Sequence, residues 1–210
     1  ASNYSAWTIP DDEDTFNVDV IVKQWFWEFH YQEELTWEDD PSITYVNVDW
    51  SATDLTVDTR GSEATNVTVE IDGVKFDYAI DLVAEMASIS DFYLDVNLHS
   101  VVTVYDANDV LLHTWEHLPV GTILSTAGGQ NLIIPCDESS TLDLYSRPHD
   151  NSNPAYVGVQ HAFWLPEWGV KEDLVPGLEA GTVMTFMPGD AGTFPIRCAG
   201  YFGGYPTKVV

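Results

Sequence analysis

The chain has 210 residues, of which 34 are Asp or Glu and 7 are Lys or Arg, so its formal net charge is -27 at pH 7. A field of this sign repels nucleic acid and anionic lipid, which argues against either as a direct partner. Hydrophobic residues make up 45% of the chain and aromatic residues 13%, so it is not an acidic disordered tail and can bury a real core.

The acidic residues must lie on the surface of a folded body. At molar salt the Debye length shrinks to about 3 Å, which relieves the repulsion among surface carboxylates. The composition therefore favours an extracytoplasmic protein of a halophile. Attraction to a cationic partner is the alternative cause of the charge.

The first half of the chain predicts an N-terminal arm followed by strands. Residues 1–15 are polar and acidic, and residues 17–31 alternate apolar and polar side chains, which predicts one long strand. Asp72-Gly73 predicts a tight hairpin turn. The spacing of apolar residues over 80–90 is compatible with a short helix or with a strand. Further alternating stretches are 44–50, 54–59, 66–71 and 74–80.

The second half continues the pattern of short strands separated by turn residues. The expected strands are residues 94–105, 110–117, 131–135, 141–146, 157–164, 182–187 and 192–198. Strands at this spacing indicate an all-β sandwich or barrel. No apolar run approaches the ~18 residues that a membrane-spanning helix needs.

Several motifs together resemble subunit II of the haem-copper respiratory oxidases. They are Gln24–Tyr31 (QWFWEFHY), Gln160–Pro166 (QHAFWLP), Gly169–Lys171, Val175–Gly177 and Gly192–Cys198 (GTFPIRC). The resemblance implies a cupredoxin-like Greek-key barrel or sandwich. In that family the barrel holds a two-copper centre that passes electrons from a carrier to haem. The resemblance assigns residues 16–33 and 131–210 to the cupredoxin-like domain and leaves residues 34–130 as a large β-rich insertion.

The chain departs from this family in the ligand cluster that starts at Cys198. Where the family has Glu, Cys, His and Met after its first Cys, this sequence has Gly200, Phe202, Pro206 and Val209. Of the family's ligands only His161 and Cys198 remain. Two bridging thiolates hold the paired coppers together, and one thiolate with one imidazole cannot supply that core. The resemblance therefore implies that the binuclear centre is lost.

A mononuclear copper site is the alternative, because such a site needs two imidazoles and one thiolate. The candidate ligands are His149, His161 and Cys198. An empty pocket with a packed histidine and an inert thiol is the competing interpretation. Met184 and Met187 are possible axial donors, but their strand spacing favours an interpretation as core and edge residues. The barrel register implied by the resemblance separates Cys136 from Cys198 too far for a disulfide.

Other aromatic and imidazole side chains have weaker interpretations. Trp25 matches the residue that the family uses for electron entry, but without a copper acceptor beneath it, core packing beside Trp27 explains it better. His113 and His117 stand four apart, which would suit a zinc site on a helix, but the surrounding pattern predicts a strand.

Three functional hypotheses follow. The first is a non-catalytic subunit II-like domain docked on the outer face of a membrane haem-copper oxygen or nitric oxide reductase. Its partner would be the haem-bearing catalytic subunit, with a quinol or a small carrier protein as electron donor, and it would hold no cofactor. The second is a mononuclear copper electron carrier using His161 and Cys198. The third is a binding module that keeps only the fold. The chain would lie on the extracytoplasmic face of the membrane, anchored through a partner or through a removed segment.

Overall fold

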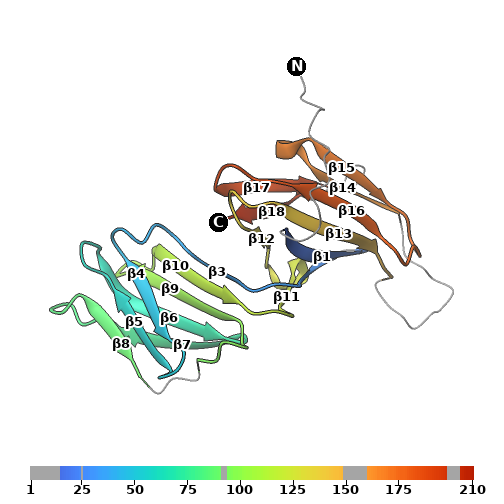
Figure 1. The fold of residues 1–210 in the computed structure, drawn as a ribbon. Coiled ribbons are helices and arrows are strands. Elements are labelled where there is room, and N and C mark those ends of the chain that lie inside the picture. Colours follow the sequence, from blue (N-terminus) through green and yellow to red (C-terminus); the bar gives the residue numbers. More distant parts are fainter. Residues whose placement is uncertain (1–14, 25, 91–93, 149–159, 198–203) are drawn as a thin grey trace. The chain divides into compact units, whose positions relative to one another are not determined.

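A computed structural model describes residues 15–24, 26–90, 94–148, 160–197 and 204–210 (Figure 1). The chain divides into two compact units: unit 1 is Ala1–Glu33 with Gly121–Val210, and unit 2 is Glu34–Val120. The described elements are strands apart from two short 3-10 helices, η1 (Thr126–Gly128) and η2 (Pro166–Trp168). The all-β class predicted from the sequence is confirmed. Neither of these helical segments is long and apolar enough to cross a membrane.

Unit 1 contains two five-stranded sheets. The first, in spatial order, is β11 (Ile123–Ser125), β2 (Phe26–Tyr31), β1 (Phe16–Lys23), β13 (Ser140–Ser146) and β16 (Thr182–Phe186). The second is β12 (Leu132–Ile134), β18 (Gly204–Val209), β17 (Gly192–Arg197), β14 (His161–Leu165) and β15 (Val170–Leu174). The chain crosses repeatedly between the sheets, and β1–β13 and β12–β18 pair in parallel. This two-sheet arrangement is consistent with the cupredoxin-like Greek-key sandwich that the resemblance implies.

The core of unit 1 comes from the alternating inner faces of these strands. On β1 the even-numbered residues from Phe16 to Val22 are buried, and on β14 Phe163 and Leu165 are fully buried. The ring centroids of Trp27 and Phe163, from opposite sheets, lie 5.4 Å apart. The Tyr31 hydroxyl also joins the sheets, because it donates to the Ile133 carbonyl (2.6 Å) and accepts from the Ile133 N–H (2.8 Å).

The prediction of one long strand over 17–31 is wrong, because the segment is the β1–β2 hairpin with Lys23 paired to Phe26. The physical reason lies in the parity of the buried positions. Val20 and Val22 are buried at even numbers, whereas Trp27 and Phe29 are buried at odd numbers. Residues of one regular strand share a face only when their numbers differ by an even amount. A single strand would have exposed one of these two sets.

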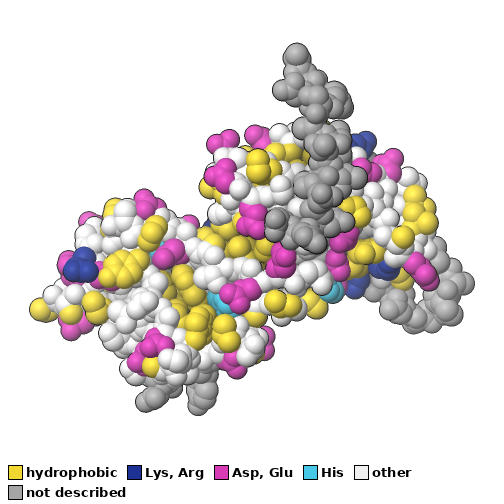
Figure 2. Space-filling view, viewed as in Figure 1, with side chains coloured by type: hydrophobic (Ala, Val, Ile, Leu, Met, Phe, Trp, Pro, Cys, Tyr) yellow, Lys and Arg dark blue, Asp and Glu magenta, His cyan; other side chains and the backbone are white. Residues whose placement is uncertain are grey.

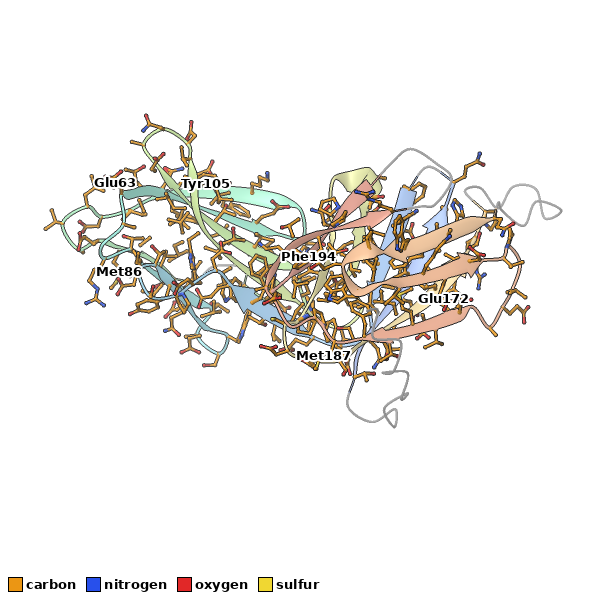
Figure 3. All side chains as sticks on the ribbon, turned by 90° about the horizontal axis from the view of Figure 1, so that it is seen from above. Glu63, Met86, Tyr105, Glu172, Met187 and Phe194 are labelled. Atoms are coloured by element: carbon orange, nitrogen blue, oxygen red, sulfur yellow. The ribbon has the colours of Figure 1, made fainter. Side chains whose placement is uncertain are left out.

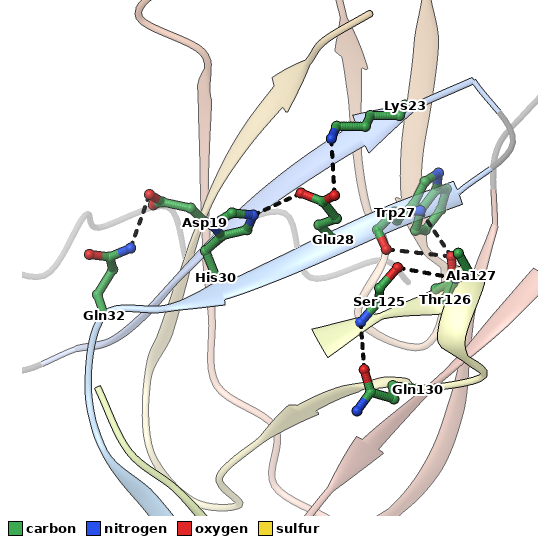
Figure 4. Close-up of polar contacts among 10 residues, drawn as sticks. All are labelled: Asp19, Lys23, Trp27, Glu28, His30, Gln32, Ser125, Thr126, Ala127 and Gln130. Atoms are coloured by element: carbon green, nitrogen blue, oxygen red, sulfur yellow. Dashed lines mark hydrogen bonds and ion pairs between the residues drawn. The ribbon is translucent and has the colours of Figure 1, made fainter. Parts of the chain in front are cut away.

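Residues 121–130 belong to unit 1, although the sequence analysis assigned them to the insertion. β11 pairs antiparallel with β2 and extends its sheet. The N–H of Trp27 donates to Thr126 Oγ1 at 2.9 Å, and the Ser125 N–H donates to Gln130 Oε1 at 3.0 Å (Figure 4). These contacts join the η1 turn to the sheet of unit 1.

Unit 2 also contains two sheets around an apolar core. The larger sheet, in order, is β3 (Leu35–Glu38), β10 (Leu111–Leu118), β9 (Ser100–Asp106), β6 (Ala64–Ile71) and β7 (Val74–Ala79). The smaller is β4 (Tyr45–Asp49), β5 (Asp54–Asp58) and β8 (Met86–Ile89). Leu55, Val57, Val67, Val69, Val102 and Val104 are fully buried between them. The turn predicted at Asp72-Gly73 is present, with φ of 48° and 83°.

The helix considered for 80–90 does not form. Asp81 Oδ1 accepts hydrogen bonds from the backbone of Val83 (2.9 Å) and Ala84 (3.1 Å), which closes a turn, and Glu85 has a φ of 53°. The chain then enters β8, which pairs with β5. The pairing of β8 with β5 therefore makes this segment a turn and a strand, where the spacing of apolar residues alone also allowed a helix.

Candidate functional site

His161 is the one candidate copper ligand that lies within the described residues. It begins β14 opposite Leu174 of β15, and it shares a strand face with Phe163 and Leu165, which are fully buried. His161 is partly buried, and its Nε2 atom is inaccessible to solvent with no hydrogen-bond partner in the described part of the chain. The side chain therefore sits at the edge of the sandwich interior, and no described residue pairs with its Nε2 atom.

Burial lowers the pKa of the His161 imidazole below its ordinary value of 6.5. Desolvation disfavours the charged imidazolium, so the neutral form persists to lower pH. A neutral imidazole is the form that binds a transition metal. His161 thus has the protonation state and the unpaired nitrogen that a ligand needs.

The other two candidate ligands, His149 and Cys198, lie outside the described residues, as does Trp25. Arg197, directly before Cys198, is described. It pairs with Trp164 of β14, and its guanidinium carbon lies 5.9 Å from the centre of the Trp164 ring. The end of β17 therefore adjoins the strand that carries His161. In the described residues no group of three or more His, Cys, Asp or Glu side chains is arranged to hold a metal ion.

Two of the positions that the resemblance to subunit II assigns to copper ligands are described, and both lie on β18. Pro206 pairs with Pro195 of β17, and Val209 pairs with Gly192 on one side and Ile134 on the other. Val209 is 2% exposed. The segment is a strand with a neighbour on each side. At the two positions, Pro206 and Val209, neither side chain can bind copper.

The methionines follow their interpretation as core and edge residues. Met184 on β16 is fully buried, whereas Met187, just beyond that strand, is 61% exposed. Cys136 is a free thiol, and burial together with the nearby Asp137 and Asp190 carboxylates raises its pKa. A thiol with a raised pKa forms little of the nucleophilic thiolate at neutral pH.

The described histidines other than His161 already have hydrogen-bond partners. His30 Nε2 lies 3.0 Å from Glu28 Oε2, and the same carboxylate pairs with Lys23 (Figure 4). His113 Nε2 lies 2.9 Å from Glu38 Oε2, and both nitrogens of His117 are hydrogen-bonded, to Thr36 and to the Val96 carbonyl. Both histidines lie on strand β10. The weak zinc alternative at His113 and His117 therefore has no support in the geometry.

Sequence reasoning missed a buried carboxylate on the same strand. Glu116 is 8% exposed; its Oε1 accepts from the Trp37 indole (3.2 Å) and its Oε2 lies 2.6 Å from His99 Nε2. In a chain with 34 acidic residues no local signal distinguishes this one. Its arrangement ties β3 and the start of β9 to β10, which is a structural role.

No protein-family model matches the chain. Over 47 residues it is 38% identical to cytochrome c oxidase subunit 2 of Synechocystis sp. (strain ATCC 27184 / PCC 6803 / Kazusa), a match that covers 22% of this chain and 14% of the relative. Among solved structures, the crystal structure of the mixed disulfide intermediate between a thioredoxin-like protein and subunit II of cytochrome c oxidase aligns over 97% of this chain and 87% of that chain, with 15% identity and a TM-score of 0.40. The chain therefore carries a segment that is similar in sequence to subunit II of cytochrome c oxidase.

Proposed function

We propose that this protein is a subunit II-like cupredoxin domain that has lost the binuclear copper centre. It docks on the extracytoplasmic face of a membrane haem-copper oxygen or nitric oxide reductase, beside the haem-bearing subunit. Its role is structural: it covers the catalytic subunit and shapes the place where the electron donor, a quinol or a small carrier protein, approaches. The segment similar to subunit II and the cupredoxin-like sandwich of unit 1 support this proposal.

The proposal depends above all on which side chains strand β18 carries. Pro206 and Val209 occupy two of the family's ligand positions, and neither side chain offers a nitrogen or sulfur donor. Val209 is packed in the interior and β18 is paired with both β12 and β17. A two-copper centre needs two bridging thiolates and flanking donors, and this strand provides neither a thiolate nor a donor at those positions.

Metal analysis tests the loss of the binuclear centre. The natively purified protein, before and after incubation with Cu(II) and a reductant, is measured by elemental mass spectrometry and visible spectroscopy. We expect fewer than two copper ions per chain and no spectrum of a two-copper thiolate centre, because the bridging set is incomplete. Two tightly held coppers per chain would overturn the proposal.

Co-purification tests the docking role separately. A tagged full-length chain is expressed in its own host, membranes are extracted with mild detergent, and haem is measured in the purified complex by its absorption spectrum. The expected result is haem in a fixed ratio to the tagged chain, retained at the host's own ionic strength. A chain that purifies without haem under these conditions would show that it is not a subunit of such a reductase.

The Nε2 atom of His161, which has no hydrogen-bond partner among the described residues, favours a second candidate function, a mononuclear copper electron carrier. His161 fits one ligand of a site with Cys198 and His149, and copper bound there would supply one-electron transfer. In this case the protein would bind one copper per chain and show a thiolate-to-copper absorption band. His161→Ala would abolish that band, whereas His30→Ala, which removes a histidine already paired with Glu28, would leave it unchanged.

A further inference from the structure

Three loops of unit 2 meet at the end of the unit where β6 begins. Ala64 of β6 pairs with Asp106 of β9, and the Thr65 carbonyl accepts a hydrogen bond from the Ile80 N–H at 3.0 Å. The β9–β10 and β7–β8 loops therefore lie on either side of the start of β6. Glu63, Met86 and Tyr105 are labelled at this end in Figure 3.

The loop between β3 and β4 reaches the same end. A Cβ atom added to Gly61, three residues before β6 begins, would lie 3.8 Å from Cγ2 of Ile43. Tyr45, at the start of β4, pairs with Asp58 at the end of β5, and Asp58 pairs with Met86. All three loops thus belong to one end of unit 2.

These loops and the start of β10 expose a set of large apolar side chains that we call the apolar tip. Leu82 is 66% exposed, Val83 is 97% exposed, and the remaining members are between 39% and 56% exposed. Figure 2 shows hydrophobic and acidic side chains together at this end. Single exposed apolar residues are normal on a protein surface, but a group of them at one place marks an interaction site. The apolar tip consists of Ile43, Leu82, Val83, Val110, Leu111 and Leu112.

Each of the three loops is held in shape by an aspartate that caps its turn. Asp81 Oδ1 accepts from the backbone of Val83 and Ala84, as described above. Asp106 Oδ1 accepts from the Asn108 and Val110 N–H groups at 2.8 and 2.9 Å. Asp40 Oδ1 accepts from the Ser42 N–H at 2.9 Å, directly before Ile43. A surface fixed in this way loses little conformational entropy when a partner binds.

A β-bulge adds to the exposed apolar surface on β10. The register with β9 shifts between Leu111 and His113, and Leu111 and Leu112 are 53% and 39% exposed. Adjacent residues of a regular strand face opposite sides of the sheet, so one of the two leucines would normally turn toward the core. The bulge instead leaves both accessible to a partner.

The charge around the apolar tip selects the kind of partner. The three loops, together with the β5–β6 loop that contains Gly61, carry six acidic residues and one basic residue, Arg60. The Arg60 Nε donates to Asp58 Oδ1 at 3.0 Å, and this guanidinium lowers the pKa of Asp58 to about 2. The only positive charge of the loops is therefore already paired. The acidic residues of these loops are Asp39, Asp40, Glu63, Asp81, Glu85 and Asp109.

We propose that the apolar tip docks a protein partner whose apolar patch is bordered by lysine and arginine. An anionic membrane or a second copy of this chain would bring negative charge against the acidic border, which costs free energy. A basic border instead gains from it and is steered toward it. The apolar tip lies wholly within unit 2, so docking there does not depend on whether unit 1 binds copper.

The test uses a defined probe, a labelled synthetic amphipathic peptide of leucine and lysine, and a matched peptide of leucine and glutamate. Binding to the full chain is measured by fluorescence anisotropy. The double variant Leu82→Ser, Val83→Ser should weaken binding of the leucine–lysine peptide by about tenfold or more, because buried apolar anchors dominate interface affinity. The control is Val74→Ser, since Val74 is 57% exposed but lies beside the turn at the far end of β6.

The acidic border is tested with Glu63→Gln and Glu85→Gln, which should weaken binding and reduce its dependence on NaCl. Equal binding by wild type and the Leu82→Ser, Val83→Ser variant would overturn the proposal, as would equal binding of the leucine–glutamate peptide. Tip-dependent binding to phosphatidylglycerol vesicles, or a tip-dependent dimer in sedimentation, would identify a membrane or a second copy as the occupant instead. Circular dichroism verifies that the variants remain folded.

Discussion

At the scale of single residues, Gly181 occupies a position that no other residue fits without strain. Its φ is +64°, and an added Cβ would lie 2.6 Å from Tyr145 Cε1 and 2.7 Å from the Leu144 carbonyl oxygen. Such distances are well inside van der Waals contact, and one of the two atoms belongs to the backbone of β13, which cannot move independently. The glycine therefore allows the chain to pass close to β13 before entering β16.

Gly181→Ala should lower the free energy of unfolding by about 2–4 kcal/mol, because the left-handed conformation and the steric overlap both add cost. Gly169→Ala is the matched control: Gly169 has the same φ of +64°, and nothing lies within 4 Å of its added Cβ. The control should cost about 1–2 kcal/mol, from the backbone conformation alone. Both are measured by urea unfolding. Equal losses in the two variants would show that the overlap at Gly181 relaxes freely.

His161 gives a pH-dependent prediction. Because burial lowers its pKa in the folded state below 6.5, the unfolded chain binds the proton more readily. The free energy of unfolding of the metal-free protein should therefore fall as the pH drops below about 6.5 and level off below the folded-state pKa.

We expect His161→Gln to lose less stability than wild type between about pH 7.5 and pH 5.5, since the variant has no imidazole to protonate. Urea unfolding at several pH values measures this difference, and the comparison cancels the contributions of the other histidines. Parallel pH profiles for the two proteins would contradict the prediction.

At the scale of elements, β10 holds unit 2 together through contacts on both of its faces. His113 and His117 on one face bond to Glu38 and Thr36 of β3. Glu116 on the other face joins Trp37 and His99. These side-chain contacts add to the backbone ladder between β3 and β10, which pairs the first and last strands of unit 2.

Glu116→Ala should lower the free energy of unfolding by about 1–3 kcal/mol, because the Trp37 N–H and the His99 ring lose a buried acceptor. The control is Glu70→Ala. Glu70 lies on β6, its side chain is 34% exposed, and its Oε2 atom lies 3.7 Å from Lys75 Nζ. That exposed pair is worth about 0–1 kcal/mol. Unfolding is followed by tryptophan fluorescence and circular dichroism. A loss at Glu116 no larger than at Glu70 would mean that water replaces the missing carboxylate.

At the scale of the whole molecule, the net charge of -27 is the dominant property. The free energy of unfolding should rise with NaCl, most steeply between about 0.05 and 0.5 M, where the Debye length falls below about 10 Å. Repulsion among carboxylates is screened in this range. Thermal unfolding midpoints at a series of NaCl concentrations measure the effect.

The control for the salt effect is a triple variant in which exposed acids that are not part of the loops of the apolar tip become neutral: Glu34→Gln, Glu138→Gln and Glu179→Gln. This variant should start from a higher midpoint at low salt and gain less from added NaCl, because it has less charge to screen. A gain identical to that of wild type would attribute the salt effect to stronger hydrophobic burial instead.

The sequence predicted much of the fold because its signals are local. Alternation over 141–146 and 182–187 gave strands that form as β13 and β16, and Asp72-Gly73 gave its hairpin turn. The alternation over residues 17–31 switches its apolar positions from even numbers, up to Val22, to odd numbers, from Trp27 on. This switch could have revealed the β1–β2 hairpin. The spacing of apolar residues could not decide between helix and strand over residues 80–90, because the pairing of β8 with β5 is a contact between distant segments.

By itself the sequence determined the all-β class and the acidic composition, since these depend on residue type and short-range period. Only the tertiary structure decided that β11 belongs with unit 1, that Glu116 is buried between Trp37 and His99, and that His161 has a buried nitrogen with no hydrogen-bond partner among the described residues. It also gathered the loops of the apolar tip around the start of β6. Each of these depends on strands far apart in the chain becoming neighbours, which no local pattern of residues encodes.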